Sequence, residues 1–496
     1  MGALPNLSDQ IPARRLVYHT FRMSTPRTIR LRRSFAKSRL RDAASLGAIV
    51  ISLAACATSA HPGATVAPVA SCVVGDAPRN GGDTLSVAVM APVDWTHLPE
   101  ATNAAERLAF AQTYETLIDV DCEGRAVPGL AALWTLDLTR TRITLSLRKG
   151  ARFWSGKPMT ASDVLTAWRT TAARSLSSSP LARVMVAGTT IVDDHTLTVS
   201  LPDTAWLVLA DGTLAIYEPQ SGAAWPEGSG PYRVGERPAE LPPGGFVLTP
   251  FAPAFDPYLA SRLVPSGDPR DAIDAASDVL VTADPVAVTY AAARANLVAV
   301  PLPWTHTYAL AMPGPALEIA SVLLRPDVES SALRASLARD AVHVEARAAQ
   351  PSWWDDGRLC SAIRDSLPAT KATDGRSNRV VYRRDDAVAR GLAERLVALD
   401  PGSVAAGLAA DDFVRALRDG GELVYVLDLP RVFLSSCNDV DVLRSAAPWL
   451  VRGGGVDARL VPLIDTRESA IVRRYRVSAT VDWRGTLHFS DAGRRP

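Results

Sequence analysis

The sequence contains few of the side chains from which metal sites and catalytic centres are usually built. Its 496 residues include five cysteines and seven histidines, scattered without the spacing of a zinc-binding motif. A glycine–x–serine–x–glycine elbow and a paired cysteine–histidine arrangement are also missing. Gly150 and Gly156 are one residue too far apart for a phosphate-binding loop, and Pro158 follows Lys157. We therefore expect no cofactor, no bound metal and no enzymatic activity.

A long apolar run and an excess of basic charge are missing as well. The longest apolar stretch, residues 43–55, has thirteen residues, whereas a membrane-spanning helix needs about 20. The first 55 residues hold ten Lys or Arg and two Asp, so the remainder carries 43 basic and 50 acidic side chains, a net charge of −7. Such a chain offers no basic face to nucleic acid, and we expect no nucleic-acid partner.

The first 55 residues are typical of an export signal rather than of a folded domain. A basic segment precedes the short apolar stretch, and small residues come directly before Cys56. The segment Leu53-Ala54-Ala55-Cys56 resembles a bacterial lipobox, in which the cysteine is lipidated; a plain signal peptide with a chance cysteine is the alternative. Residues 32–37 are similar to a twin-arginine export motif, although an ordinary basic segment explains them equally well. Met23 is an alternative start.

The remaining chain is long enough for at least two lobes. Residues 56–80, rich in Ala, Pro, Thr and Gly, are predicted to be a flexible tether. Four cysteines remain after Cys56, and an even number in an exported protein predicts two disulfides with three connectivities. We favour Cys72–Cys122 and Cys360–Cys437, with buried free thiols as the alternative.

The residues from 111 to 169 have the most regular local pattern. Apolar and polar residues alternate over 141–147, which predicts a half-buried strand. A turn at Gly150 follows, and the Gly and Pro within 155–158 end the extended segment. Thr160 with Asp163 three residues later is a variant capping box at a helix start. Strand, turn and capped helix form a packing unit without a nucleophile and base.

Further elements are expected along the chain from the same local rules. The predicted strands are 83–90, 196–201, 380–382 and 423–427, and the predicted helices are 101–117, 331–346, 386–399 and 412–418. The last strand is a short, bounded, continuously apolar run, as in buried parallel strands. This alternation of strands and helices predicts an α/β protein.

One set of motifs is specific enough to indicate a family. It consists of Tyr114-Glu115, Leu117, Asp119, Gly124, Pro128-Gly129-Leu130-Ala131, Trp134, Leu147-Arg148, Phe153, Gly156, Pro158, Thr160-Ala161 and Asp163-Val164. In this order the motifs resemble those of the family 5 extracellular solute-binding proteins, the peptide-binding lipoproteins of ABC importers. Gly230-Pro231-Tyr232 resembles the second marker of that family. The resemblance covers roughly residues 80–490 and is looser after about Gly235.

The resemblance implies an α/β fold of the periplasmic-binding-protein type II class. Two main lobes would surround a ligand cleft, with an extra inserted subdomain. The signal peptide (1–55) and the tether (56–80) would come first. Lobe I would comprise residues 81–110, 205–301 and 462–496. The inserted subdomain, which contains the family motifs, would comprise 111–204, and the second lobe 302–461.

The resemblance also suggests where a ligand binds. In the family, a carboxylate in a tryptophan–x–x–aspartate segment binds the peptide ammonium group, and Tyr425-Val426-Leu427-Asp428 resembles that segment. Asp428 is then the candidate anchor, unless it only caps a strand end. Tyr425, Tyr114, Tyr232 and Trp304 are candidates for the cleft wall, although aromatic residues at such places are more often in the core.

The resemblance implies a monomeric substrate-binding lipoprotein of an ABC importer. Its partners would be a short peptide or another small polar solute, an ABC permease, and the membrane through a lipid anchor on Cys56. Its location would be the outer face of the cytoplasmic membrane or the periplasm. The alternative is a degenerate lipoprotein of the same fold with a regulatory or scaffolding role in the cell envelope.

Overall fold

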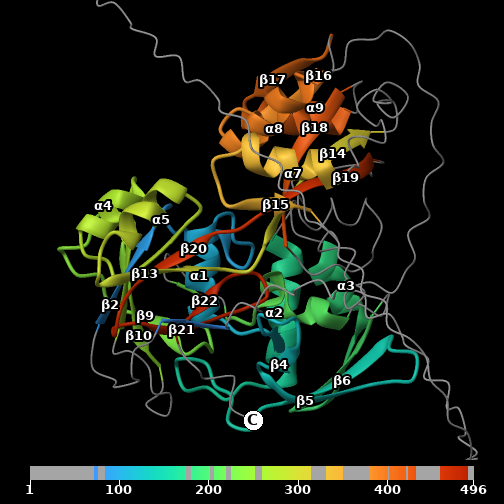
Figure 1. Cartoon of the computed structure of the whole chain (residues 1–496). Helices are drawn as coiled ribbons and strands as arrows, with labels where there is room; N and C mark the ends of the chain where they lie inside the picture. The colour runs from blue at the N-terminus through green and yellow to red at the C-terminus, as the bar shows by residue number, and fades with distance from the viewer. Residues whose placement is uncertain are drawn as a thin grey trace, which may run out of the picture. The chain divides into compact units, whose positions relative to one another are not determined.

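The computed structural model describes residues 72–75, 84–174, 180–201, 206–218, 225–251, 260–313, 331–349, 379–399, 402–419, 423–431 and 458–489. Contacts divide the chain into two units, Met1–Thr65 and Val66–Pro496, and all described residues belong to the second. They form a mixed α/β fold with five sheets in the described ranges (Figure 1). The expected lipidation site Cys56 and the expected Cys360–Cys437 pair lie outside the described residues.

The largest sheet among the described residues has seven strands. In sheet order they are β13 (Leu297–Pro301), β20 (Ser469–Arg473), β12 (Val279–Thr282), β2 (Thr84–Val89), β11 (Ala260–Pro265), β10 (Phe246–Pro250) and β9 (Tyr232–Val234). β2 runs parallel to both neighbours, and every other pair is antiparallel. The sheet therefore contains strands from both ends of the described chain.

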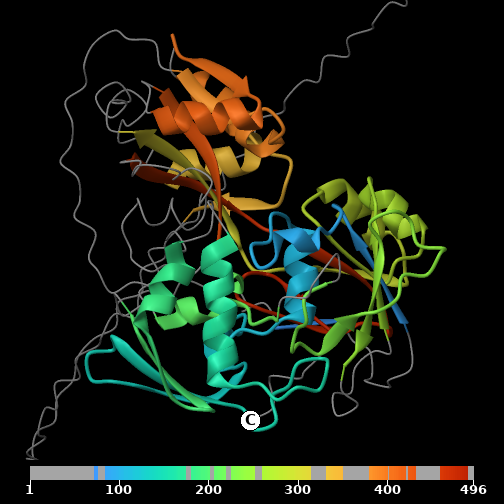
Figure 2. The ribbon, with the colours of Figure 1, turned by 180° about the vertical axis from the view of Figure 1, so that it is seen from behind.

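Helices cover both faces of this sheet, as the alternation of side chains requires. One face buries Ala88, Leu280 and Ile471 against α4 (Pro269–Asp274) and α5 (Pro285–Ala292). The opposite face buries side chains from the same three strands against α1 (Ala104–Thr113): Leu85, Val87, Val89, Val279, Ala470 and Val472. In Figure 2, α4 and α5 lie together on one face, and α1 lies on the other.

A second sheet, with six strands, is mixed. In order they are β15 (Ala346–Ala348), β19 (Ala458–Thr466), β14 (His306–Pro313), β18 (Leu423–Pro430), β16 (Arg379–Arg383) and β17 (Val404–Leu408). α7 (Ser331–Asp340) and α8 (Ala387–Val397) pack on one face, whose side chains include Leu310 and Val426. α9 (Ala410–Asp419) packs on the other face, where Phe413 contacts Tyr425. β18 runs parallel to β16 but antiparallel to β14, so it is not in an all-parallel sheet.

The chain passes between these two sheets twice, and the two crossing segments lie side by side. Residues 302–305 lead from β13 to β14, and residues 467–468 lead from β19 back to β20. The backbone N–H of Leu302 donates to the carbonyl of Glu468 over 2.9 Å. Both crossings therefore meet the same end of the six-stranded sheet, where His306 pairs with Thr466 in register.

The family motifs lie mainly around smaller sheets. β5 (Ala131–Leu136), β6 (Arg142–Leu147), β8 (Thr196–Ser200) and β7 (Thr189–Asp193) form an antiparallel sheet in that order, beside the hairpin of β3 (Ile118–Val120) and β4 (Ala126–Pro128). α2 (Ala161–Arg174) and α3 (Pro180–Gly188) cover one face of the four-stranded sheet (Figure 2). A third small sheet contains β1 (Val73–Gly75), β21 (Ser478–Val481) and β22 (Leu487–His488).

A disulfide attaches the first described residues to this region. It joins Cys72 to Cys122, with a Cα–Cα distance of 5.5 Å, and Cys72 adjoins β1. This is one of the two pairs expected from the sequence. Three short 3-10 segments complete the described elements: η1 (Trp95–His97), η2 (Trp206–Ala210) and η3 (Gly212–Leu214).

Most expected elements are present, with shifted ends. The helix expected over 101–117 ends at Thr113, because Tyr114 has an extended backbone (φ −130°, ψ 140°). The helix expected over 331–346 ends at Asp340, and β15 follows. β18 continues beyond Leu427 to Pro430, so Asp428 lies inside the strand and does not cap its end. β19 continues through Pro462 to Thr466.

Candidate ligand-binding site

The family motifs have structural partners in this protein. Arg148 Nη2 donates to both carboxylate oxygens of Glu115, at 3.0 and 3.2 Å, and Nη1 donates to the Gly129 carbonyl at 3.1 Å. Three motif residues from three segments are thus tied together. Their hydrogen-bonding groups hold these segments together, which agrees with the prediction that this part of the chain is a packing unit.

The capping box at the start of α2 has a similar role. Asp163 accepts from the backbone N–H of Thr160 at 2.8 Å and from its hydroxyl at 2.7 Å. Lys157 Nζ lies 3.0 Å from Asp163 and 3.0 Å from Glu218, so it joins the helix start to a distant segment. Asp163 therefore reaches back over the first turn, as the Glu of a capping box does.

The Gly230-Pro231-Tyr232 marker requires glycine because backbones approach closely there. The N–H of Gly230 donates to the Thr113 carbonyl at 3.0 Å, and a Cβ on Gly230 would collide with the same backbone. The indole of Trp154 donates to the Gly230 carbonyl at 3.3 Å. Gly228 is equally crowded, between Thr113 and Trp154. The marker is thus a packing contact against the end of α1.

Three of the aromatic candidates for the cleft wall are core residues. Tyr114 packs against Trp154, and its hydroxyl donates to the Pro226 carbonyl at 3.0 Å. Tyr232 is fully buried in the core between α1 and the seven-stranded sheet. Tyr425 is fully buried on the α9 face. Because successive strand residues face opposite sides, Tyr425 and Asp428 point to opposite faces of the sheet. These three tyrosines therefore belong to the core, as aromatic residues at such places more often do.

Asp428 lies where a ligand could reach a carboxylate. It is directly opposite Tyr308 on β14 and diagonal to His306, on the α7–α8 face of the sheet. About a third of its side chain, 34%, is exposed. His306 Nδ1 lies 3.0 Å from Oδ1 and 3.1 Å from Oδ2 of Asp428. The candidate anchor thus has a partner that sequence reasoning missed.

Further charged groups surround this pair. The Tyr308 hydroxyl donates to Asp386, the N-cap of α8, at 3.4 Å. Burial raises the pKa of Asp386, and the charge of Asp428 adds to the rise. Burial alone would lower the pKa of His306, but the charge and hydrogen bond of Asp428, with the charge of Glu468, raise it overall. This end of the sheet therefore favours a cation.

Arg107 of α1 brings a positive charge to the same place. Burial lowers the pKa of Arg107, opposed by the negative charges of Glu468 and Asp428. Within the described part of the chain its guanidinium donates no hydrogen bond, and its interactions with Glu468 and Asp428 are electrostatic. Arg107 and Glu468 were not predicted, because only the tertiary structure brings them beside Asp428.

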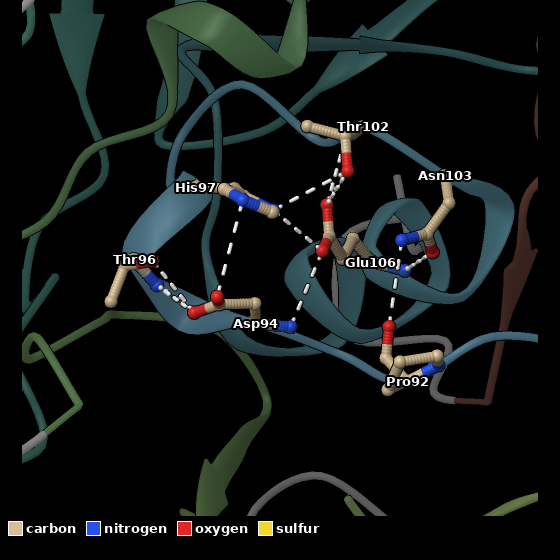
Figure 3. Close-up of polar contacts among 7 residues, drawn as sticks. All are labelled: Pro92, Asp94, Thr96, His97, Thr102, Asn103 and Glu106. Atoms are coloured by element: carbon tan, nitrogen blue, oxygen red, sulfur yellow. Dashed lines mark hydrogen bonds and ion pairs between the residues drawn. The ribbon is translucent and has the colours of Figure 1, made fainter.

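A buried carboxylate holds the helix turn that carries Arg107 (Figure 3). Glu106, 1% exposed, accepts from the N–H of Thr102 at 2.7 Å and from the N–H of Asp94 at 3.2 Å. His97 Nδ1 lies 2.8 Å from Glu106, and the Asn103 side chain caps the Glu106 N–H at 2.9 Å. The preceding loop and the first turn of α1 are thereby fixed, which sets the position of Arg107.

Trp304 is the fourth aromatic candidate, and its ring makes cation–π contacts with two arginines. The guanidinium carbons of Arg347 and Arg467 lie 4.6 and 4.4 Å from its centroid. Arg347 also binds Asp465 at 3.0 Å, and Asp465 accepts from the Thr307 hydroxyl at 2.7 Å. Burial raises the pKa of Asp465 despite these hydrogen bonds. Trp304 therefore braces the crossing segments.

Arg431, which follows β18, connects that strand to the sheet with β21 and β22. Its guanidinium lies 4.5 Å from the ring centroid of Trp483 and donates to the Trp483 carbonyl at 3.1 Å. Its backbone N–H donates to Thr305 at 2.6 Å.

Comparisons with known proteins agree on the fold. Residues 125–240 match the sequence model of the family described as bacterial extracellular solute-binding proteins, family 5 Middle. None of the curated protein sequences matches this chain. Among the described residues, no helix has the length and apolar character needed to span a membrane.

Solved structures of binding proteins are similar over most of the chain. The ABC transporter substrate-binding protein CtaP from Listeria monocytogenes has a TM-score of 0.59 at 14% identity, covering 80% of this chain and 94% of that one. The Escherichia coli murein tripeptide binding protein MppA has 0.54 at 14%, covering 82% and 98%. NikA from Brucella suis, in complex with Fe(III)-EDTA, has 0.56 at 15%, covering 78% and 95%. At such identities the likeness establishes the type II periplasmic-binding-protein fold alone.

Proposed function

We propose that this chain captures short peptides, or another small solute with a free amino group, and delivers them to an ABC permease. The match of residues 125–240 to the family 5 extracellular solute-binding proteins supports this proposal. The observation that carries this proposal is the Asp428 carboxylate. It is partly exposed, lies at the end of the six-stranded sheet where both crossing segments arrive, and has negative neighbours. An ammonium group is the ligand chemistry that such a carboxylate favours.

The crossing segments support a hinged binding cycle. Two short connections, 302–305 and 467–468, are the described backbone links between the two large sheets. Hinge closure about a few connecting residues is a common response to ligand in binding proteins. Under this proposal the closed state binds the solute better than the open one, and that difference drives closure. We propose the same division into lobe I, inserted subdomain and second lobe, except that the second lobe ends at Thr466 rather than at residue 461, because residues 462–466 belong to β19 and pair with β14.

The proposed location follows from the first 56 residues. A basic and apolar export segment ends at Cys56, in a lipobox-like context. Lipidation there would tether the protein to the outer face of the cytoplasmic membrane, beside the permease. The alternative location is the periplasm. Mass spectrometry of the native amino terminus tests this directly, and a processed chain that begins elsewhere than at a lipidated Cys56 would refute it.

The test of solute capture uses peptides that differ only at the amino terminus. We expect alanine peptides to bind in calorimetry and their N-acetylated forms not to bind. Asp428→Asn should weaken binding by at least about tenfold, because a charge-assisted hydrogen bond contributes about 1.5–3 kcal/mol. Asp412→Asn is the matched control, since Asp412 is exposed on α9, on the opposite face of the sheet.

Equal binding of free and acetylated peptides, or unchanged affinity in Asp428→Asn, would contradict the anchor. The envelope-scaffold alternative has one observation in its favour, namely that His306 already satisfies Asp428. Native mass spectrometry of the purified protein separates the two functions. A co-purified small solute supports capture, whereas protein that never carries a solute and never binds a peptide supports the scaffold.

A further inference from the structure

We propose that the His306 proton and the ammonium group of the solute compete for Asp428, so that capture of each amine-bearing solute releases one proton. This inference rests on the proposed function and adds to it. It makes His306 a residue that determines the pH range in which the site binds an amine.

The geometry places His306 where the ammonium group would have to bind. Its Nδ1 lies within 3.1 Å of both carboxylate oxygens of Asp428, so it approaches the carboxylate centrally rather than from one side. The side chains are 21% and 34% exposed, so solvent and solute can reach the pair. Among the described residues, His306 is the hydrogen-bonding partner of the Asp428 carboxylate. An ammonium group that takes the same oxygens comes within a few ångströms of the imidazole.

The charges around the pair favour a single extra cation. The groups that act on His306 come from three elements: Asp428 of β18, Glu468 of the crossing segment and Arg107 of α1. Asp386, at the start of α8, and Arg383 interact with Asp428. With His306 protonated, the cations Arg107 and His306 balance the anions Asp428 and Glu468. With His306 neutral, one negative charge is left for the solute.

Electrostatics therefore links the proton to the solute. Two unit cations about 4 Å apart repel by about 1 kcal/mol in water and by several times more in a partly buried site. The pKa of His306 is raised in the ligand-free protein by its acidic neighbours, although burial opposes this. A bound ammonium group offsets the negative charge of Asp428 and so lowers the pKa of His306. Affinity must then increase with pH until His306 is neutral in the free protein.

The experiment measures affinity and proton release together. Trialanine is titrated into the full mature protein between about pH 5 and about pH 7, below the pKa of a peptide amine, about 8. The titrations are repeated in two buffers with different ionisation enthalpies. We expect affinity to increase with pH, approaching about tenfold per pH unit, and about one proton to be released per peptide bound. Dialanine and tetra-alanine extend the probe set.

Two variants isolate the contribution of His306. His306→Gln retains a hydrogen-bond donor for Asp428 but cannot carry the proton. It should bind trialanine at the lowest pH as tightly as the natural protein does at the highest, with no proton release. His195→Gln is the matched control, because His195 is an exposed turn residue. It should keep the natural pH dependence.

The outcomes distinguish this inference from the proposed function. Trialanine that binds with the same affinity at every pH, or without proton release, overturns the competition while leaving peptide capture intact. A His306→Gln protein that keeps the natural pH dependence does the same. If neither alanine peptides nor any co-purified amine binds at any pH, the proposed function itself fails.

Discussion

The region of the family motifs and the sheet end around Asp428 use charged side chains in opposite ways. In the motif region, Glu115, Arg148, Lys157 and Asp163 bind one another or the backbone and hold β5, β6 and α2 in place. At the sheet end, by contrast, the Asp428–His306 pair is partly exposed among groups with shifted pKa values. The motifs that identify the fold are therefore not the residues that would hold a ligand.

Gly230→Ala disturbs the packing of the motif region and should reduce stability more than the other variants. Gly230→Ala should lower the free energy of unfolding by about 2 kcal/mol or more, because a Cβ meets the backbone of Thr113 and cannot be accommodated without movement. Urea unfolding measures this. Gly267→Ala is the control, since a Cβ there meets open space, and its effect should be within about 0.5 kcal/mol. Equal effects of the two changes would show that the marker is not a packing contact.

Two substitutions that each remove one carboxylate charge should separate the roles of the two regions. Asp428→Asn should reduce trialanine affinity by at least about tenfold while changing stability little. Glu115→Gln should do the reverse, costing about 1 kcal/mol of stability because Arg148 loses its ionic partner, with unchanged affinity for the peptide. Calorimetry and urea unfolding on both variants form the test. If Glu115→Gln weakens peptide binding as much as Asp428→Asn does, the division of roles is wrong.

Trp304 braces the crossing segments, and its loss should affect stability more than peptide affinity. Trp304→Leu removes both cation–π contacts with Arg347 and Arg467 and should lower stability by about 1–2 kcal/mol. The peptide affinity of the closed site should change less than in Asp428→Asn. Thermal unfolding with and without trialanine measures both quantities. Affinity lost as completely as in Asp428→Asn would instead make Trp304 a direct ligand contact.

The weakest change that we predict is a pH dependence of stability caused by His306. The folded-state pKa of His306 is raised above its ordinary value, near 6.5. Its contribution to stability is therefore fully present below about pH 6.5 and is lost as the pH rises through the folded-state pKa. The stability difference between the natural protein and His306→Gln should shrink over that interval. Urea unfolding at several pH values without peptide tests this, and a difference that grows with pH would reverse the assigned sign.

Local rules predicted the elements well and the site incompletely. The strand over 141–147 and the helix capped by Thr160 are present as β6 and α2, because alternation and capping act within a few residues. The helix expected over 101–117 is shorter, because Tyr114 turns into the core contact with Trp154. Tyr425 was grouped with Asp428, but a strand places residues three apart on opposite faces.

Local patterns in the sequence predicted many of the strands and helices, the family that the motifs resemble, and Asp428 as a candidate anchor. The groups around that carboxylate come together only when the chain folds. His306 is 122 residues from Asp428, and Arg107 is farther still along the chain. Their meeting depends on the register of β14 with β18 and on the return of the chain from β19 to β20. A hairpin turn fixes register locally, but β14 and β18 are far apart in the sequence, so their register depends on matching the buried faces of both strands, which neither segment specifies alone.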